Sequence, residues 1–132
     1  ISKIIERIGD HAVRIAENAQ PVLDADLDPK IVAALKKASV LSMQIFDKSI
    51  ISFFNADIRE AHKTIESVSA LEHICGDISN MAFRQETMAA ISISYISESI
   101  RRSGEYAADI CENVINYIVE EDRSLHRKPS GK

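Results

Sequence analysis

Apolar residues recur at intervals of three and four along most of the chain, which is the period of an amphipathic helix. In the first such segment, residues 2–19, this spacing places Ile8 and Ile15 on one face. We expect this helix to end before Pro21, because proline removes a backbone donor and disfavours the helical conformation of the residue before it. The chain therefore opens with a predicted helix.

Three longer helices are predicted after an Asp-rich loop. The second covers residues 29–54, and Asp28-Pro29 is typical of a helix start. The third covers residues 58–84 and the fourth residues 87–121. The predicted core stripe of the second helix is Ile31, Leu35, Ala38, Ser42, Ile45, Ser49 and Phe53.

The short connections between these helices force neighbouring helices to run antiparallel. The chain has only four glycines and three prolines, too few for the turns of a many-stranded sheet. We therefore predict an all-α, antiparallel, up-and-down helix bundle. Residues 122–132 lack an apolar period and are expected to form a disordered tail.

Charge and composition exclude several classes of protein. The net charge of −4 argues against binding to a nucleic-acid backbone as the main function. No uncharged run approaches the ~20 apolar residues that a membrane-spanning helix needs, so we expect no membrane insertion. Cys75 and Cys111 suit small buried residues of a reduced protein. No catalytic constellation and no glycine-rich phosphate loop is present.

Two segments of the chain have similar sequences, "ERIGDHAVRIAEN" from Glu6 and "RRSGEYAADICEN" from Arg101, and we call them the two copies of a repeated phrase. The identical pairs are Ile5 and Ile100, Arg7 and Arg102, Gly9 and Gly104, Ala12 and Ala107, Ile15 and Ile110, Glu17 and Glu112, and Asn18 and Asn113. Because these pairs fall both on and off the apolar stripe, we interpret them as a duplication. Residues 1–20 are then the last helix of an earlier unit that is truncated here, and residues 28–121 form a complete three-helix unit.

Both copies of the phrase carry acidic residues on the side opposite their apolar stripe. In the first copy these include Glu6 and Asp10, and in the second they are Glu98, Glu105, Asp109 and Glu112. A solvated polar face explains the pattern. A surface metal site explains it as well, because carboxylates four residues apart lie one turn apart and can chelate or bridge a hard cation.

Three segments resemble the PhoU family of phosphate-uptake regulators: "ERIGDHAVRIAE", "FFNADIREAHKTI" and "SIRRSGEYAADICENVINYIVE". The resemblance implies two three-helix repeats, each with an acidic Glu/Asp-x-x-x-Asp motif on its last helix. It further implies a cytoplasmic, non-enzymatic regulator that acts on a phosphate ABC-transporter ATPase, a sensor kinase or both. Members of the family tend to be homodimers.

The resemblance also implies metal ligands. Glu6 and Asp10 match the first acidic motif, which in some members binds iron or another metal such as Mg, Mn or Zn; the metal is not required for folding. The second motif departs from the pattern, because Arg101 replaces its first carboxylate. Glu105 and Asp109 form a Glu-x-x-x-Asp one turn later, so the second copy has either a shifted site or no metal site.

Two histidines lie near acidic groups. His11 follows the first motif and is interpreted as a histidine at the edge of the packed face, although it could join a metal site. The segment "EHICGD" places His73 and Asp77 one turn apart, with Cys75 between them. A mixed metal site there would need Cys75 to point outward, whereas its position on the apolar stripe predicts the opposite.

We therefore expect a metal-modulated protein-binding module in phosphate signalling. Two other functions fit the same pattern. One is a carboxylate-bridged metal enzyme, a hydrolase or an oxidase. The other is a purely structural dimerisation bundle within a larger transcriptional regulator.

Overall fold

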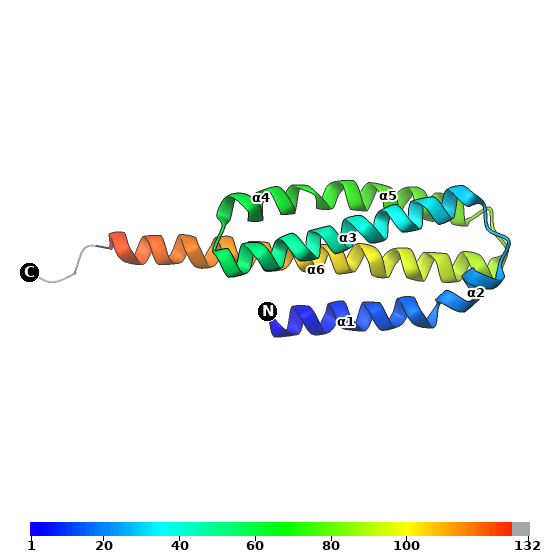
Figure 1. Cartoon of the computed structure of the whole chain (residues 1–132), viewed down its shortest axis with the longest axis horizontal. Helices are drawn as coiled ribbons and strands as arrows, with labels where there is room; N and C mark the ends of the chain where they lie inside the picture. Colours follow the sequence, from blue (N-terminus) through cyan, green and yellow to red (C-terminus); the bar gives the residue numbers. More distant parts are fainter. Residues whose placement is uncertain (128–132) are drawn as a thin grey trace, which may run out of the picture.

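The computed structural model describes residues 1–127 of the chain, and within them it contains helices and no strand. The helices are α1 (Ser2–Glu17), α2 (Ala19–Asp24), α3 (Pro29–Asn55), α4 (Ile58–Glu66), α5 (Val68–Ala82) and α6 (Thr87–His126). Long helices lie side by side along one axis and are joined at the ends of the molecule (Figure 1). The predicted all-α antiparallel bundle is confirmed.

Helix α6 is the centre of the bundle and contacts all five other helices. Helices α3, α4 and α5 pack on α6 and on one another, which gives a three-helix bundle if α4 and α5 count as one bent helix. Helix α1 runs antiparallel to α6 on the other side (Figure 1). Within the described residues it contacts only α6 and α2, and none of its residues is fully buried.

The core lies where α3, α5 and α6 meet. Its largest fully buried side chains are Ile31, Ile45, Leu71, Ile78, Ile93 and Ile110. Between them lie small residues, of which several are serines. The hydroxyl of Ser42 donates to the Ile100 carbonyl of α6 at 3.0 Å. Among the described residues no buried side-chain polar atom lacks a partner, so these serines bring helices close without an unsatisfied group.

The first helix ends before Pro21, as predicted, but a short helix that was not predicted follows it. Helix α1 ends at Glu17, and α2 then begins at Ala19 and contains Pro21 as its third residue. Proline is tolerated there because the amide groups of the first helical turn have no partner within the helix. Pro21 thus lies inside a short helix, in a segment that was expected to be a loop.

The predicted third helix is divided at Ser67 into α4 and α5. Around the break, Thr64, Ser67 and Ser69 donate their hydroxyls to carbonyls three or four residues earlier. Such bonds compete with the helical backbone and bend helices. The apolar period continues across the bend, which is why the pattern alone predicted one helix.

The last helix is longer than predicted, and the expected disordered tail is wrong for residues 122–126, which continue α6. Glutamate and arginine, which recur in this segment, are good helix formers. The His126 and Asp122 side chains lie 3.2 Å apart, one turn from each other, and Arg123 lies in the final turn. Residues 128–132 of the predicted tail lie outside the described residues.

The corner between α3 and α4 places two phenylalanines at the surface. Ala56 closes α3 in the left-handed conformation, with φ of 50°, and the side chain of Asp57 caps α4 by accepting from the Glu60 amide at 3.0 Å. Phe53, which was predicted to face the core, is 42% exposed, and Phe54 is 78% exposed. Ser52 takes the buried position at this end of α3 instead.

The two glycines of the repeated phrase have different surroundings. A Cβ added at Gly104 would collide with the Leu71 side chain of α5, whereas one added at Gly9 would meet nothing. Gly104 therefore permits the close approach of α5 and α6. The matching position on α1 faces open space.

These two positions make a matched test of the packing. Gly104→Ala should lower the free energy of unfolding by roughly 1–3 kcal/mol, because Leu71 must move within a packed core. Gly9→Ala should raise it by roughly 0.5–1 kcal/mol, because alanine is the better residue inside a helix. Urea unfolding of both variants measures the two changes. Equal effects at the two sites would contradict this account of the α5–α6 contact.

Candidate functional site

The first acidic pair lies on the outer face of α1. Glu6 and Asp10 are both exposed, as the helical projection predicted. Neither forms an ion pair with a described residue. They are separated by one turn on the same side of the helix, so both carboxylates are open to solvent and to a ligand.

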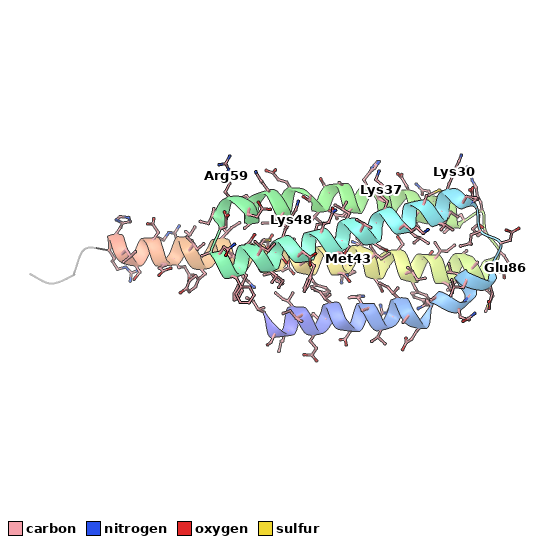
Figure 2. The ribbon with its side chains drawn as sticks, in the orientation of Figure 1. Lys30, Lys37, Met43, Lys48, Arg59 and Glu86 are labelled. Atoms are coloured by element: carbon pink, nitrogen blue, oxygen red, sulfur yellow. The ribbon has the colours of Figure 1, made fainter. Side chains whose placement is uncertain are left out.

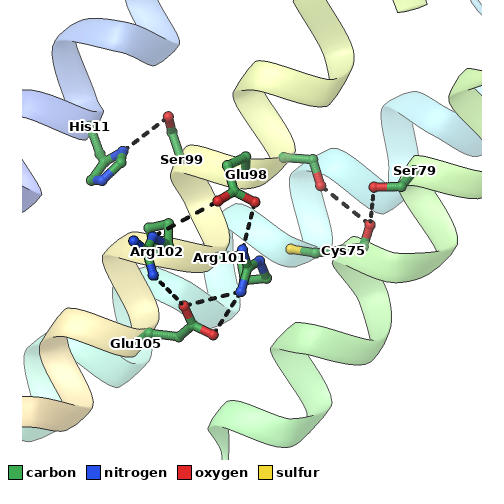
Figure 3. A network of polar contacts seen from close by, with 9 residues as sticks. His11, Cys75, Ser79, Glu98, Ser99, Arg101, Arg102 and Glu105 are labelled. Carbon is green, nitrogen blue, oxygen red and sulfur yellow. Dashed lines mark hydrogen bonds and ion pairs between the residues drawn. The ribbon is translucent and has the colours of Figure 1, made fainter.

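The second acidic pair lies in a different environment, because Arg101 holds Glu105. One nitrogen of the Arg101 guanidinium contacts both oxygens of Glu105, at 2.9 and 3.2 Å, and the other donates to Glu98 at 2.7 Å. Arg102 lies 3.8 Å from each of the same two carboxylates. Figure 3 shows this network along one side of α6. The two arginines thus neutralise carboxylates that a cation would otherwise use.

Glu105 is also partly covered, unlike the first pair, whereas Asp109 is exposed. The Glu105 side chain is 25% exposed. Burial raises the pKa of Glu105, the nearby Arg101 lowers it, and Glu72 of α5 raises it again. Burial likewise raises the pKa of Asp109, and Arg7 of α1 lowers it. Glu105, Asp109 and Glu112 therefore line a groove between helices, and Glu105 is less open to solvent than we predicted.

This groove is an acid-lined hollow of about 540 Å³ between the α4–α5 bend and α6. Its acidic lining residues are Glu66, Glu72, Glu105, Asp109 and Glu112. Glu66 and Glu72 were not predicted as neighbours of the second motif. Glu72 follows the core residue Leu71, which packs at Gly104 beside Glu105. That contact between helices is not visible without the fold.

The seam between α1 and α6 is formed by His11, Tyr106 and two arginines. His11 Nδ1 lies 3.1 Å from the Ser99 hydroxyl, and its ring lies 5.8 Å from the Tyr106 ring. The guanidinium carbons of Arg7 and Arg102 lie 5.7 and 5.6 Å from the centre of the Tyr106 ring, within cation–π distance. His11 is therefore engaged in packing α1 against α6.

The other histidine segment does not form the mixed metal site. His73 Nε2 and Asp77 Oδ2 lie 3.6 Å apart on the exposed side of α5. Cys75 is buried in the core, as its position on the stripe predicted.

The structure does not gather the four predicted ligands. Within residues 1–127, no group of three or more His, Cys, Asp or Glu side chains is placed to hold a metal ion. The pair Glu6 and Asp10 and the pair Glu105 and Asp109 thus remain two separate surface features of the described chain.

An apolar valley separates α1 from α3 above the central helix. One part of this valley is a hollow of about 490 Å³, which is lined by residues of α1, α3 and α6 that include Ile8, Ile15, Met43 and Phe46. A second hollow, of about 710 Å³, continues it between α2 and α3. The apolar face of α1 is thus covered on the α6 side alone.

Taken together, the fold and these surfaces define an all-α bundle whose charged groups lie on its outside. No helix of the described chain combines the length and the apolar character that crossing a membrane requires. Residues 35–114 match the PhoU domain family, and this match covers more than half of the chain. The chain belongs to the PhoU domain family.

A curated relative is the phosphate-specific transport system accessory protein PhoU homolog of a Burkholderia species. It is 27% identical over 140 aligned residues, which cover 98% of this chain and 59% of that protein. The chain thus spans about three-fifths of the length of the relative. No solved structure matches the chain.

The His11 contacts predict a dependence of stability on pH. Burial first, and then the charges of Arg14 and Arg102, lower the pKa of His11 below its ordinary value of 6.5, while Glu98 and Asp10 oppose the shift. His11 therefore binds a proton more readily in the unfolded chain than in the folded chain. The free energy of unfolding should consequently fall as the pH drops below about 7.

Urea unfolding at a series of pH values measures this effect. The difference in unfolding free energy between the wild type and His11→Gln should shrink as the pH falls from about 7 to 5. His62→Gln, which replaces an exposed histidine of α4, is the control and should leave the pH dependence unchanged. A constant difference between wild type and His11→Gln would contradict the assignment.

Proposed function

We propose that this chain is part of a regulator of phosphate uptake and phosphate signalling, a binding module rather than an enzyme. The observation that carries the proposal is the match of residues 35–114 to the PhoU domain. The name of the curated relative, an accessory protein of a phosphate-specific transport system, supports it. The regulator acts in the cytoplasm, on the ATPase of a phosphate ABC transporter, on a sensor kinase, or on both.

Metal modulation is the second part of the proposal, and Glu6 and Asp10 fit this function. Both carboxylates are exposed, one turn apart and free of ion pairs with described residues. Two carboxylates supply part of the coordination of a hard cation such as Mg²⁺ or Mn²⁺, and such cations retain several waters. For iron or zinc the pair alone offers too few ligands.

Glu105 and Asp109 fit a cation only after a rearrangement. Arg101 occupies Glu105 with a contact to each oxygen, and a cation beside a guanidinium is repelled. Rotation of Arg101 away from Glu105 would free this carboxylate toward the acid-lined hollow, which offers Glu72 and Glu112 as further ligands. We propose that α1 holds the stronger site and α6 the weaker one.

Titration of the full chain with Mn²⁺, measured by isothermal titration calorimetry, tests both sites. Glu6→Gln and Asp10→Asn should each weaken the stronger binding by roughly tenfold, since each removes one charged ligand. Glu17→Gln is the control, because Glu17 is an exposed carboxylate of α1 outside the motif.

The same titration distinguishes the second site. Arg101→Gln should strengthen binding at Glu105 and Asp109, because it removes the competing charge. Mn²⁺ affinity that none of Glu6→Gln, Asp10→Asn and Arg101→Gln alters would refute the metal part of the proposal and leave the regulatory part standing.

Partner binding tests the regulatory part. The full-length protein should retain the ATPase subunit of a phosphate transporter in a pull-down, and should not retain the ATPase subunit of an unrelated ABC transporter. If metal modulates the contact, Glu6→Gln with Asp10→Asn should reduce this retention severalfold. Failure to bind both the transporter ATPase and the cognate sensor kinase would overturn the proposal.

We further propose that α1 is the last helix of an earlier three-helix repeat, whose other helices cover the valley between α1 and α3. The repeated phrase supports this, because Gly104 of α6 is packed against α5 whereas Gly9 of α1 faces open space. The length of the curated relative supports it too, since two-fifths of that protein has no counterpart in this chain.

A further inference from the structure

One edge of α3 carries a row of lysines in solvent. Lys30, Lys37 and Lys48 are exposed and are separated by seven and eleven residues. These intervals are close to two and three whole helical turns, so the three side chains project from the same side of α3. Arg59 adds a fourth exposed cation at the start of α4, and Figure 2 shows the four residues spread along the length of α3. None of them is in an ion pair with a described residue.

Basic charge is concentrated on this helix. Helix α3 carries four lysines against a single aspartate, whereas α6 carries three arginines against seven carboxylates. The aspartate of α3, Asp47, lines the valley on the α1 side, and Asp57 at the corner is engaged as the cap of α4. A chain whose net charge is −4 thus has one strongly basic side.

Apolar side chains lie beside the row at the corner between α3 and α4. Ile51 is 52% exposed and follows Lys48 by three residues, so the two lie close together on the surface of α3. Phe54 is 78% exposed in the last turn of α3, and its ring packs edge to face on that of Phe53, with centres 5.4 Å apart. We define the lysine face as the set Lys30, Lys37, Lys48, Ile51, Phe54 and Arg59.

The chemistry of the lysine face favours a lipid surface over an acidic protein. Interfaces between proteins are enriched in arginine, whose planar guanidinium binds a carboxylate with two hydrogen bonds, and they are depleted in lysine. The hollow beside Lys37, of about 370 Å³, is lined by residues of α3 alone, so no second helix forms a wall that would hold an anchor residue of a protein partner. A plane of lipid headgroups needs no such pocket, and lysines with long flexible stems reach it easily.

We propose that the lysine face binds the surface of a membrane that contains anionic lipids, with α3 lying parallel to that surface. The 27 residues of α3 are about 40 Å long, so its lysines contact headgroups along this length. Phe54 and Ile51 enter the boundary between the headgroups and the acyl chains. The acid-lined hollow is formed by α4, α5 and α6, so it does not face the lipids. The binding is peripheral, and it adds to the proposed regulatory function without depending on it.

Co-sedimentation of the full chain with lipid vesicles tests the proposal. The chain should bind vesicles made of equal parts of phosphatidylglycerol and phosphatidylcholine, and it should not bind vesicles of phosphatidylcholine alone. Each basic residue near an anionic membrane strengthens binding roughly fivefold. The double variant Lys37→Gln with Lys48→Gln should therefore weaken binding by roughly 25-fold, and added salt should weaken the binding of the wild type.

A second double variant, Lys3→Gln with Arg123→Gln, is the matched control. It changes the net charge by the same amount, and both residues are exposed and lie outside α3. Its vesicle binding should stay close to that of the wild type. An equal loss of binding in the two double variants would overturn the proposal, because the attraction would then belong to the whole chain and not to the lysine face.

A tryptophan reports which surface meets the lipid. The chain contains no tryptophan, so Phe54→Trp introduces a single reporter. Its fluorescence emission should shift to the blue when the anionic vesicles are added, because an indole ring at the membrane interface is partly removed from water. Tyr95→Trp, at an exposed position of α6, is the control and should show no shift. A shift in Tyr95→Trp without one in Phe54→Trp would overturn the proposal.

An acidic protein partner would give a different set of results. The wild type would then bind neither kind of vesicle, and Lys37→Gln with Lys48→Gln would reduce the retention of the transporter ATPase in the pull-down. This outcome would overturn the lipid proposal and leave the regulatory function standing. Lysine-dependent vesicle binding by a protein that retains neither the ATPase nor the sensor kinase would support the lysine face and overturn the regulatory function.

Discussion

The close packing of α6 against its neighbours is the constraint on which the rest of this structure depends. Five helices contact α6, and two helices can approach closely only where the side chains between them are small. Gly104, Ala107 and the buried serines supply this space, and the hydroxyls return their hydrogen bonds to backbone carbonyls. Because α6 is surrounded in this way as far as Ile118, its charged residues in that part can reach solvent only along narrow strips between neighbouring helices.

That confinement explains why two copies of one phrase have different chemistry. On α1, which is covered on one side only, Glu6 and Asp10 are open to solvent. On α6 the matching strip lies beside α5, so Glu105 is partly covered and Glu72 is added as a neighbour. Arg101, which replaces the first carboxylate of the second motif, then neutralises Glu105 where solvent screens it least. The substitution changes an open acidic pair into an ion-pair network.

The parts of the molecule differ in how much of their surface is buried against other helices. The core between α3, α5 and α6 is fully buried, whereas α1 is held to α6 by the His11, Arg7 and Tyr106 contacts and by partly buried isoleucines. At the end of α6, every residue from Val119 to His126 is exposed. Local stability rises with buried apolar area. Contacts with further protein would therefore raise the local stability of α1 and of the end of α6 more than that of the core.

The sequence by itself determined the helical class, the order of the long helices and the outward direction of Glu6 and Asp10. These features follow from a three-and-four period that needs no knowledge of the neighbours. The bend at Ser67 and the helix at Pro21 were missed because they depend on local hydrogen bonding and on position within a turn, which leave the apolar period unchanged. The pairing of Glu105 with Arg101 lies within one helix and could have been predicted from their spacing alone. Only the tertiary structure decided that Glu72 lies beside Glu105, that His11 packs on Tyr106 and that Phe54 is exposed, because these facts depend on which helices touch and where each one ends.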